Sequence, residues 1–93
     1  MEDKIRIHAI IKGRVQGVFF RQETKRTAEA CNVTGWVKNL PDGTVEAVLE
    51  GNRDDVEKVV RWCHQGPPAA KVTEVNISQS PYTGEFDGFV IRF

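Results

Sequence analysis

The sequence predicts an α+β fold in which a mostly antiparallel β-sheet carries two helices on one face. The main observation is the order of the segments. Stretches with the alternating pattern of strands and stretches with the apolar spacing of helices follow one another as β-α-β-β-α-β, with an extra strand near the C-terminal end. The second observation is size: 93 residues without a break in composition indicate a single domain over residues 1–93.

The first strand and the first helix have clear patterns. Residues 5–12 alternate between apolar and other side chains, as in a half-buried strand. From about residue 21 to residue 32 the chain has no glycine or proline, and Thr24, Ala28 and Cys31 recur at helical spacing. We therefore expect a strand, a short connection and then a helix that packs on the sheet.

A hairpin follows the first helix. Residues 35–40 and 44–50 have strand character and are separated by Pro41-Asp42-Gly43, a sequence typical of a tight turn. A connection this short joins antiparallel strands, so these two strands are predicted to be neighbours.

The second helix is predicted to begin after Asn52, a residue type that is frequent at helix N-caps. Its apolar stripe contains Val56, Val59, Val60 and Cys63. Gly66-Pro67-Pro68 ends it. Two further strands are expected at about residues 72–79 and 86–93.

Right-handed crossovers place both helices on one face of such a sheet. The predicted architecture is the ferredoxin-like sandwich, with an extra C-terminal strand and two helices that run parallel to each other. Many unrelated functions use this architecture, so the function has to be argued from particular residues.

Composition excludes several classes of function. Thirteen basic residues balance thirteen acidic ones, so no overall charge attracts nucleic acid or an anionic membrane. No apolar run approaches the roughly 18 residues of a membrane span, and no signal-peptide pattern is present. Cys31 and Cys63 are expected to be free thiols in a reducing cytoplasm, and a bridge between the two parallel helices is the alternative. His8 and His64 do not have the spacing of metal ligands, so no metal site is predicted.

The segment between the first strand and the first helix has the composition of an anion-binding loop. It contains Gly13 and Gly17 and ends at Arg21. If Gly17 adopts a conformation that other residues avoid, the backbone N–H groups from Gln16 to Phe20 can converge on one point. The N-terminus of the helix adds positive potential there, and Arg21 can offer a bidentate guanidinium to a phosphate. A plain turn with an incidental arginine remains the alternative from spacing alone.

Asn39 is the second candidate, because it lies at the end of the predicted second strand. If the first and second strands leave the sheet at the same end, Asn39 reaches the mouth of the loop. Its amide can orient a water molecule there without repelling a phosphate as a carboxylate would.

Two extended motifs carry a resemblance to a known family. Residues 13–21 read G-R-V-Q-G-V-F-F-R, and residues 35–51 read G-W-V-K-N, three residues, G-T-V, five residues and G. Both blocks match the signatures of the acylphosphatases at every signature position. The order of elements agrees as well, so the chain resembles a single acylphosphatase domain over its whole length.

The resemblance implies hydrolysis of acyl phosphates to a carboxylate and inorganic phosphate, without a metal or organic cofactor. By similarity, Arg21 is the catalytic phosphate-binding arginine and Asn39 positions the attacking water. The loop amides of the substrate-binding residues would hold the phosphoryl oxygens: Gln16, Gly17, Val18, Phe19 and Phe20. We expect the side chains of Phe19 and Phe20 to seat the loop against the core rather than to contact the acyl group.

Other functions remain open at this stage. A non-catalytic anion-binding module would have the same sequence features, and related domains occur within larger enzymes that handle carbamoyl phosphate. An RNA-binding ferredoxin-like module is disfavoured, because the expected open face of the first and third strands lacks stacking aromatics. The expected partner is a small-molecule acyl phosphate, with no nucleic acid, no membrane and a monomeric protein; the sequence does not name the acyl group.

Overall fold

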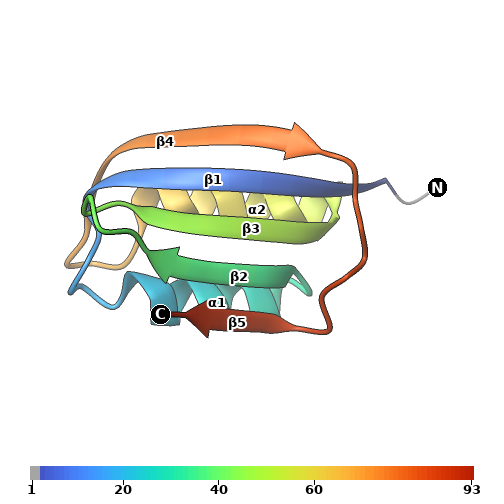
Figure 1. The fold of residues 1–93 in the computed structure, drawn as a ribbon, viewed down its shortest axis with the longest axis horizontal. Coiled ribbons are helices and arrows are strands. Elements are labelled where there is room, and N and C mark those ends of the chain that lie inside the picture. The colour runs from blue at the N-terminus through green and yellow to red at the C-terminus, as the bar shows by residue number, and fades with distance from the viewer. Residues whose placement is uncertain (1–2) are drawn as a thin grey trace.

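The computed structural model describes residues 3–93. Met1 and Glu2, which begin the predicted domain, lie outside the described residues. The elements in chain order are β1 (Lys4–Arg14), α1 (Phe20–Ala30), β2 (Thr34–Asn39), β3 (Val45–Asn52), α2 (Arg53–Gln65), β4 (Lys71–Ser80) and β5 (Phe89–Arg92). The predicted succession of strands and helices is confirmed (Figure 1).

The sheet has the strand order β4-β1-β3-β2-β5. Neighbouring strands are antiparallel except for β2 and β5, which are parallel. Figure 1 shows the sheet in front of both helices, so one face of the sheet is covered and the other is open. This is the predicted ferredoxin-like α+β sandwich with an extra C-terminal strand.

The chain direction of the helices differs from the prediction. Because β1 and β3 are antiparallel neighbours and each helix runs back along the strand before it, α1 and α2 run in opposite directions (Figure 1). Cys31 follows the end of α1 and Cys63 lies in the last turn of α2, so the two thiols are at opposite ends of the sandwich. Both are free, as expected. Burial raises the pKa of the Cys63 thiol to about 12, whereas Cys31 is only half-buried.

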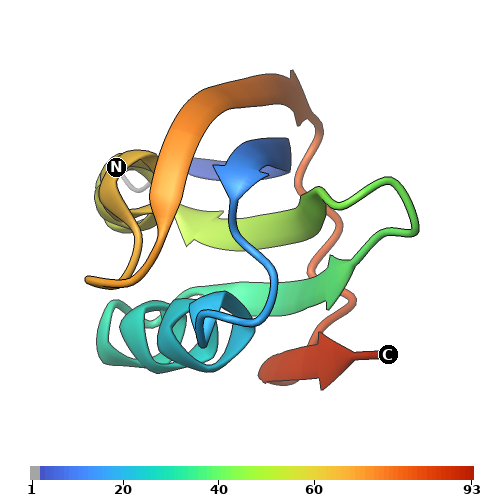
Figure 2. The ribbon, with the colours of Figure 1, turned by 90° about the vertical axis from the view of Figure 1, so that its left-hand side faces the viewer.

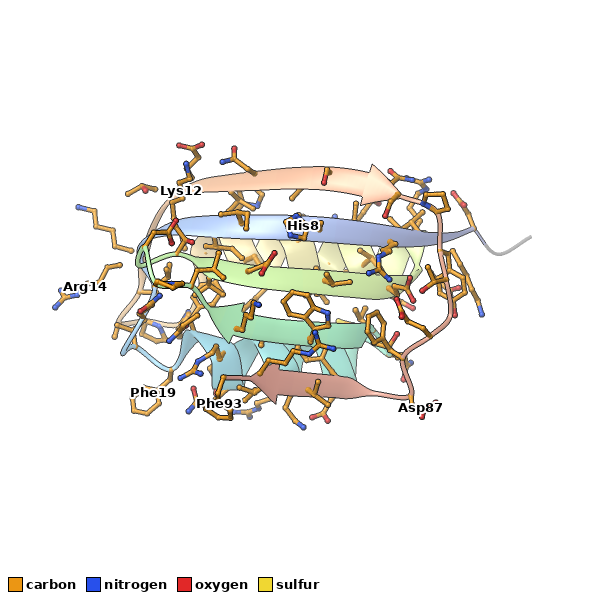
Figure 3. All side chains as sticks on the ribbon, in the orientation of Figure 1. His8, Lys12, Arg14, Phe19, Asp87 and Phe93 are labelled. Carbon is orange, nitrogen blue, oxygen red and sulfur yellow. The ribbon has the colours of Figure 1, made fainter. Side chains whose placement is uncertain are left out.

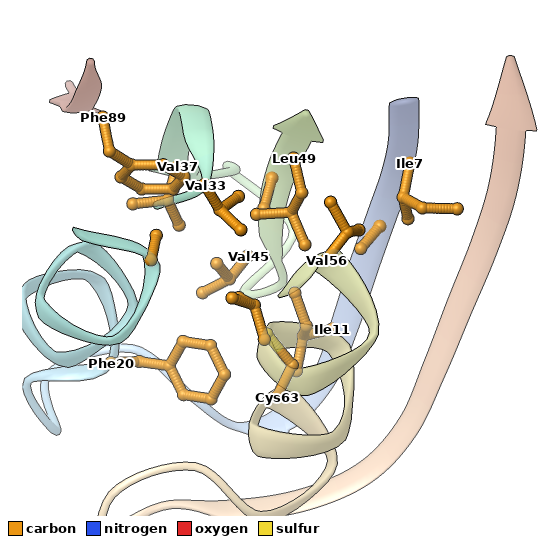
Figure 4. Close-up of a cluster of buried hydrophobic side chains, with 14 of the residues drawn as sticks. Ile7, Ile11, Phe20, Val33, Val37, Val45, Leu49, Val56, Cys63 and Phe89 are labelled. Carbon is orange, nitrogen blue, oxygen red and sulfur yellow. The ribbon is translucent and has the colours of Figure 1, made fainter. Parts of the chain in front are cut away.

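The hydrophobic core lies between the sheet and the two helices (Figure 4). Alternate residues of β1 face it, which is why the predicted strand pattern has period two. Val56, Val59 and Cys63 of α2 are completely buried against the sheet. The helical spacing of these side chains therefore corresponds to their burial.

Element boundaries differ from the prediction mainly in β1 and β5. β1 extends to Arg14, beyond its alternating segment, because it pairs with β4 after a register shift between Lys12 and Gly13. β5 covers only Phe89–Arg92, because residues 81–88 form an irregular connection over the open face.

Glu50 of β3 fastens this connection to the sheet. Its side chain has no exposed surface. The carboxylate accepts hydrogen bonds from the backbone N–H of Thr83 at 2.9 Å, the Thr83 hydroxyl at 2.9 Å and the Gly84 N–H at 3.1 Å. The Arg6 guanidinium donates to it at 3.2 Å and to Glu85 at 2.7 Å. Burial alone would raise the pKa of Glu50, but the hydrogen bonds outweigh it and hold this pKa below its ordinary value of 4.5.

We predict that Glu50→Gln lowers the free energy of unfolding at neutral pH by about 3 kcal/mol, because a charged acceptor of several buried hydrogen bonds is lost. A carboxyl whose folded pKa is depressed stabilises the protein above its unfolded pKa and loses this contribution as pH falls through the folded pKa. The free energy of unfolding of the wild type, measured with urea, should therefore decrease on acidification below the unfolded pKa of 4.5. The free energy of unfolding of the variant should decrease less. Glu57→Gln, on the exposed face of α2, is the control; equal acid dependence in wild type and Glu50→Gln would contradict this assignment.

Candidate active site

The connection between β1 and α1 lies at the same end of the sandwich as the turn between β2 and β3 (Figures 1 and 2). This follows from the topology: β1 and β2 are both antiparallel to β3, so their C-terminal ends coincide. The condition stated for Asn39 is therefore met, and the end of β2 lies beside the loop.

Two glycines shape the start and the middle of the loop. Gly13 has φ +122°, and a Cβ there would lie 2.1 Å from the Lys71 carbonyl oxygen, so only glycine permits the close approach of β1 to β4. Gly17 has φ +73° with open space around it. As predicted, Gly17 adopts a left-handed conformation that turns the backbone.

Three buried side chains anchor the loop to the core. Val15 and Val18 are 1% and 7% exposed, and Phe20 is 1% exposed. The Phe20 ring packs against Trp62 of α2 with ring centroids 5.3 Å apart. Gln16, Gly17 and Phe19 lie between these anchors and are at least partly exposed. These anchors fix the loop to the core and leave its remaining residues at the surface.

A small pocket of about 160 Å³ lies between the loop, the first turn of α1 and the end of β2. The residues that line it are Val15, Gly17, Phe19, Phe20, Arg21, Gln22 and Asn39. The pocket therefore combines both predicted catalytic residues with three of the predicted substrate-binding positions. Arg21 is the one charged residue of this lining.

The backbone of the loop offers hydrogen-bond donors. Within residues 3–93, no hydrogen bond from the N–H groups of residues 16–20 to a backbone carbonyl is found. The first N–H groups of α1 lie next to them in the chain, and the positive end of the helix dipole is located there. A run of unbonded N–H groups beside a helix N-terminus is a suitable environment for an anion.

Arg21 projects from the first turn of α1. Its guanidinium carbon lies 5.0 Å from the centre of the Phe93 ring, a cation–π contact. In the part of the chain that the structure describes, Arg21 has no carboxylate partner within salt-bridge distance. Its donors are therefore available to an anion in the pocket.

Asn39 is the last residue of β2 and pairs with Val45. Its amide oxygen is buried and has no hydrogen-bond partner among residues 3–93. Because an unpaired buried acceptor is unfavourable, this oxygen is suited to accept a hydrogen bond from a molecule in the pocket.

The side chain of Gln16 has a position that the sequence did not indicate, separate from the predicted role of its backbone N–H. It does not line the pocket; its side-chain amide donates to the Leu40 carbonyl at 2.8 Å and to the Thr44 carbonyl at 2.9 Å. Gln16 thus joins the anion-binding loop to the turn that follows Asn39. No local pattern indicated this contact, because it connects residues far apart in the sequence.

The Val18 side chain is buried and does not line the pocket, so Val18 can offer only its backbone N–H, the group that was predicted to bind. One prediction about side chains is wrong. Phe19 does not seat the loop: it is 68% exposed, with φ 66° and ψ 22° at the N-cap of α1 (Figure 3). The Phe20 side chain points into the core, as expected. The left-handed backbone conformation at Phe19 turns the Phe19 side chain outward.

Two residues at the site, Gln22 and Phe93, were not predicted from the sequence. Gln22 lines the pocket and could have been found from its position next to Arg21 in the first helical turn. Phe93 contacts Arg21 across the fold, and no local signal indicated it.

The open face includes the aromatic side chain of Trp36, which the prediction did not consider. Trp36 of β2 lies opposite Val48, with the guanidinium carbon of Arg92 4.7 Å and the Lys38 ammonium nitrogen 5.5 Å from its ring centre. His8 of the same face is paired with Glu46 at 2.6 Å. Trp36 is thus already in contact with cations of the protein itself.

Among residues 3–93, no group of three or more His, Cys, Asp and Glu side chains converges as metal ligands would. Neither α1 nor α2 has the length and apolar character that a membrane-spanning helix needs.

Comparison with known proteins identifies the family. The family model described as Acylphosphatase matches residues 7–91. An acylphosphatase from Pelotomaculum thermopropionicum is 57% identical over 90 residues, which cover 97% of this chain and 98% of that protein. The structure of an acylphosphatase from Coxiella burnetii aligns with a TM-score of 0.92 and 40% identity, covering 97% of this chain and 94% of that one. The acylphosphatase from Bacillus subtilis aligns with a TM-score of 0.92 and 34% identity, over 96% and 99% of the two chains.

These matches agree with the motifs and with the pocket at the end of the sheet, and they do not favour an RNA-binding module. The chain belongs to the acylphosphatase family.

Proposed function

We propose that this protein hydrolyses acyl phosphates to a carboxylate and inorganic phosphate at the pocket between the loop and the end of β2. The observation that carries the proposal is the composition of this pocket. It combines one guanidinium, a run of unbonded backbone N–H groups and the unpartnered amide oxygen of Asn39.

In the proposed complex the phosphoryl group lies against the loop. Backbone N–H groups of residues 16–20 donate to its oxygens, and Arg21 donates to two of them as a planar fork. These donors are fixed by the fold before substrate binds, so they stabilise the charge on the phosphoryl oxygens without reorganisation.

Asn39 is proposed to accept a hydrogen bond from the attacking water and so to direct its oxygen at phosphorus. The new bond joins the water oxygen to phosphorus, and the bond between phosphorus and the bridging oxygen breaks. The carboxylate leaves with the electron pair and needs no proton, because it is a weak base. We propose that a phosphoryl oxygen takes the proton of the water, so that no side chain acts as a general base; a pH–rate profile governed by an essential group near neutrality would contradict this step.

Hydrolysis of benzoyl phosphate in the presence of EDTA tests the function. We expect rapid release of benzoate and phosphate at an unchanged rate after EDTA treatment. A phosphate monoester such as p-nitrophenyl phosphate should react far more slowly, because its leaving group is a stronger base. Absence of turnover, together with an increase in the melting temperature on addition of phosphate, would instead identify an anion-binding module.

Gln16 provides a test of how the site is held together. We predict that Gln16→Ala lowers kcat by about tenfold, because the loop and Asn39 lose their shared alignment. Gln16→Glu should be at least as impaired, since a carboxylate of the same shape cannot donate to the Leu40 and Thr44 carbonyls. Steady-state kinetics check this, with Gln79→Ala on β4 as the control. Full activity of Gln16→Glu would show that the two hydrogen bonds do not matter for catalysis.

We also propose that the protein acts as a cytoplasmic monomer on a small-molecule acyl phosphate. Free thiols such as Cys31 and Cys63 are usual in a reducing compartment. Light scattering during size-exclusion chromatography measures the oligomeric state.

A further inference from the structure

Phe19 is exposed at the edge of the pocket between the loop, the first turn of α1 and the end of β2, here called the phosphate pocket. Its backbone has a conformation that aromatic residues seldom adopt. Its side chain is 68% exposed, its φ is 66°, and both neighbours in the chain are buried. This aromatic ring is not part of the hydrophobic core. A strained, exposed aromatic side chain at the entrance of a candidate site points to a role in binding.

Phe19 also lines a second pocket. It has a volume of about 330 Å³, and its lining residues are Val18, Phe19, Glu23, Pro67, Pro68 and Ala69. Five of these six are apolar. The connection between α2 and β4 contributes the two prolines and the alanine, at the same end of the sandwich as the loop (Figure 2). Phe19 lines both pockets, so the two are adjacent.

On the basis of the function proposed above, we propose that this second pocket receives the acyl half of the substrate, and that the preferred substrates are acyl phosphates with an apolar, uncharged acyl group. In an acyl phosphate a single bridging oxygen separates phosphorus from the carbonyl carbon. The acyl group therefore begins at the edge of the phosphate pocket, where Phe19 stands. An aromatic or branched acyl group extends across Phe19 to the apolar surface of residues 67–69, whereas an acetyl group ends before it.

Glu23 adds a second element of selectivity. It is the one charged residue in the lining of the second pocket, and its carboxylate lies 3.7 Å from the Arg26 guanidinium, on the surface of α1. A carboxylate at this position repels an acyl group that has its own negative charge. Substrates that contain a second carboxylate are therefore expected to be poorer than neutral ones.

The test compares kcat/KM for benzoyl, acetyl and succinyl phosphate. We expect the wild type to prefer benzoyl over acetyl phosphate, and Phe19→Ala to reduce this preference by about tenfold, mainly through KM for benzoyl phosphate. Phe19→Tyr should keep the preference, because it retains the ring. Ile77→Ala removes an exposed apolar side chain of β4, which is 52% exposed, and should leave the ratio unchanged. Glu23→Gln should raise kcat/KM for succinyl phosphate several-fold relative to benzoyl phosphate.

The outcomes separate the two proposals. If the wild type hydrolyses none of the three substrates, the proposed function fails. If the wild type hydrolyses them but Phe19→Ala has the same preference for benzoyl over acetyl phosphate as the wild type, the proposed function stands. The assignment of the second pocket to the acyl group is then wrong.

Discussion

Replacement of Arg21 by alanine is expected to lower kcat/KM for benzoyl phosphate by about a hundredfold or more. Arg21 is the one cation in the lining of the phosphate pocket, so no neighbouring side chain can take over its charge. Its loss should also weaken the binding of inorganic phosphate, measured by product inhibition. Arg21→Lys should recover only part of the activity, because an ammonium restores charge without the bidentate geometry.

Arg26→Ala serves as the control for Arg21→Ala. Arg26 is also on α1, its side chain is 81% exposed, and its contact with Glu23 is a surface pair. Its removal should change activity little. Near wild-type kinetics of Arg21→Ala, with the protein folded by circular dichroism, would contradict the assigned role of Arg21.

Replacement of Asn39 by alanine is expected to lower kcat by about a hundredfold while phosphate binding stays within about threefold of wild type. The reason is that Asn39 is proposed to orient the water and not to hold the phosphoryl group. Asn39→Asp should have both a lower kcat and weaker phosphate binding, because a carboxylate in the pocket repels the phosphate. Kinetics and phosphate inhibition measured on the same samples separate the two effects.

Asn52→Ala is a matched control for Asn39→Ala. Asn52 also has a buried amide oxygen without a hydrogen-bond partner in the described chain, but it pairs with Lys4 at the opposite end of the sheet. Its side chain makes no capping hydrogen bond to α2, so its removal should affect neither kcat nor phosphate inhibition. If Asn39→Ala retains the kcat of Asn52→Ala, the water is positioned by another group.

The features that could be predicted from the sequence depend on local patterns. The alternation in β1, the helical spacing in α2 and the turn before Thr44 were enough to identify the fold. The approach of Asn39 to the loop could also be anticipated, because the hairpin fixes β2 relative to β3 and the right-handed crossover fixes it relative to β1.

The features that were missed arise from contacts between distant residues. The position of the Gln16 side chain follows from carbonyl groups on the turn between β2 and β3. The opposed helix directions, by contrast, already follow from the predicted crossover and hairpin, so the parallel arrangement was an error of reasoning and not a missing signal. The outward position of Phe19 depends on a left-handed backbone at a residue that is not glycine, which an amino-acid pattern does not indicate. The buried Glu50 similarly depends on a connection that comes 33 residues later.

Hydrolysis of benzoyl phosphate in water enriched in oxygen-18 tests the central claim most directly. If the loop and Arg21 hold the phosphoryl group and Asn39 directs water at phosphorus, the enzyme-dependent product contains the label in inorganic phosphate and none in benzoate. Label in benzoate would mean that water attacks the carbonyl carbon, and the assignment of Arg21, Asn39 and the loop to phosphoryl transfer would be wrong.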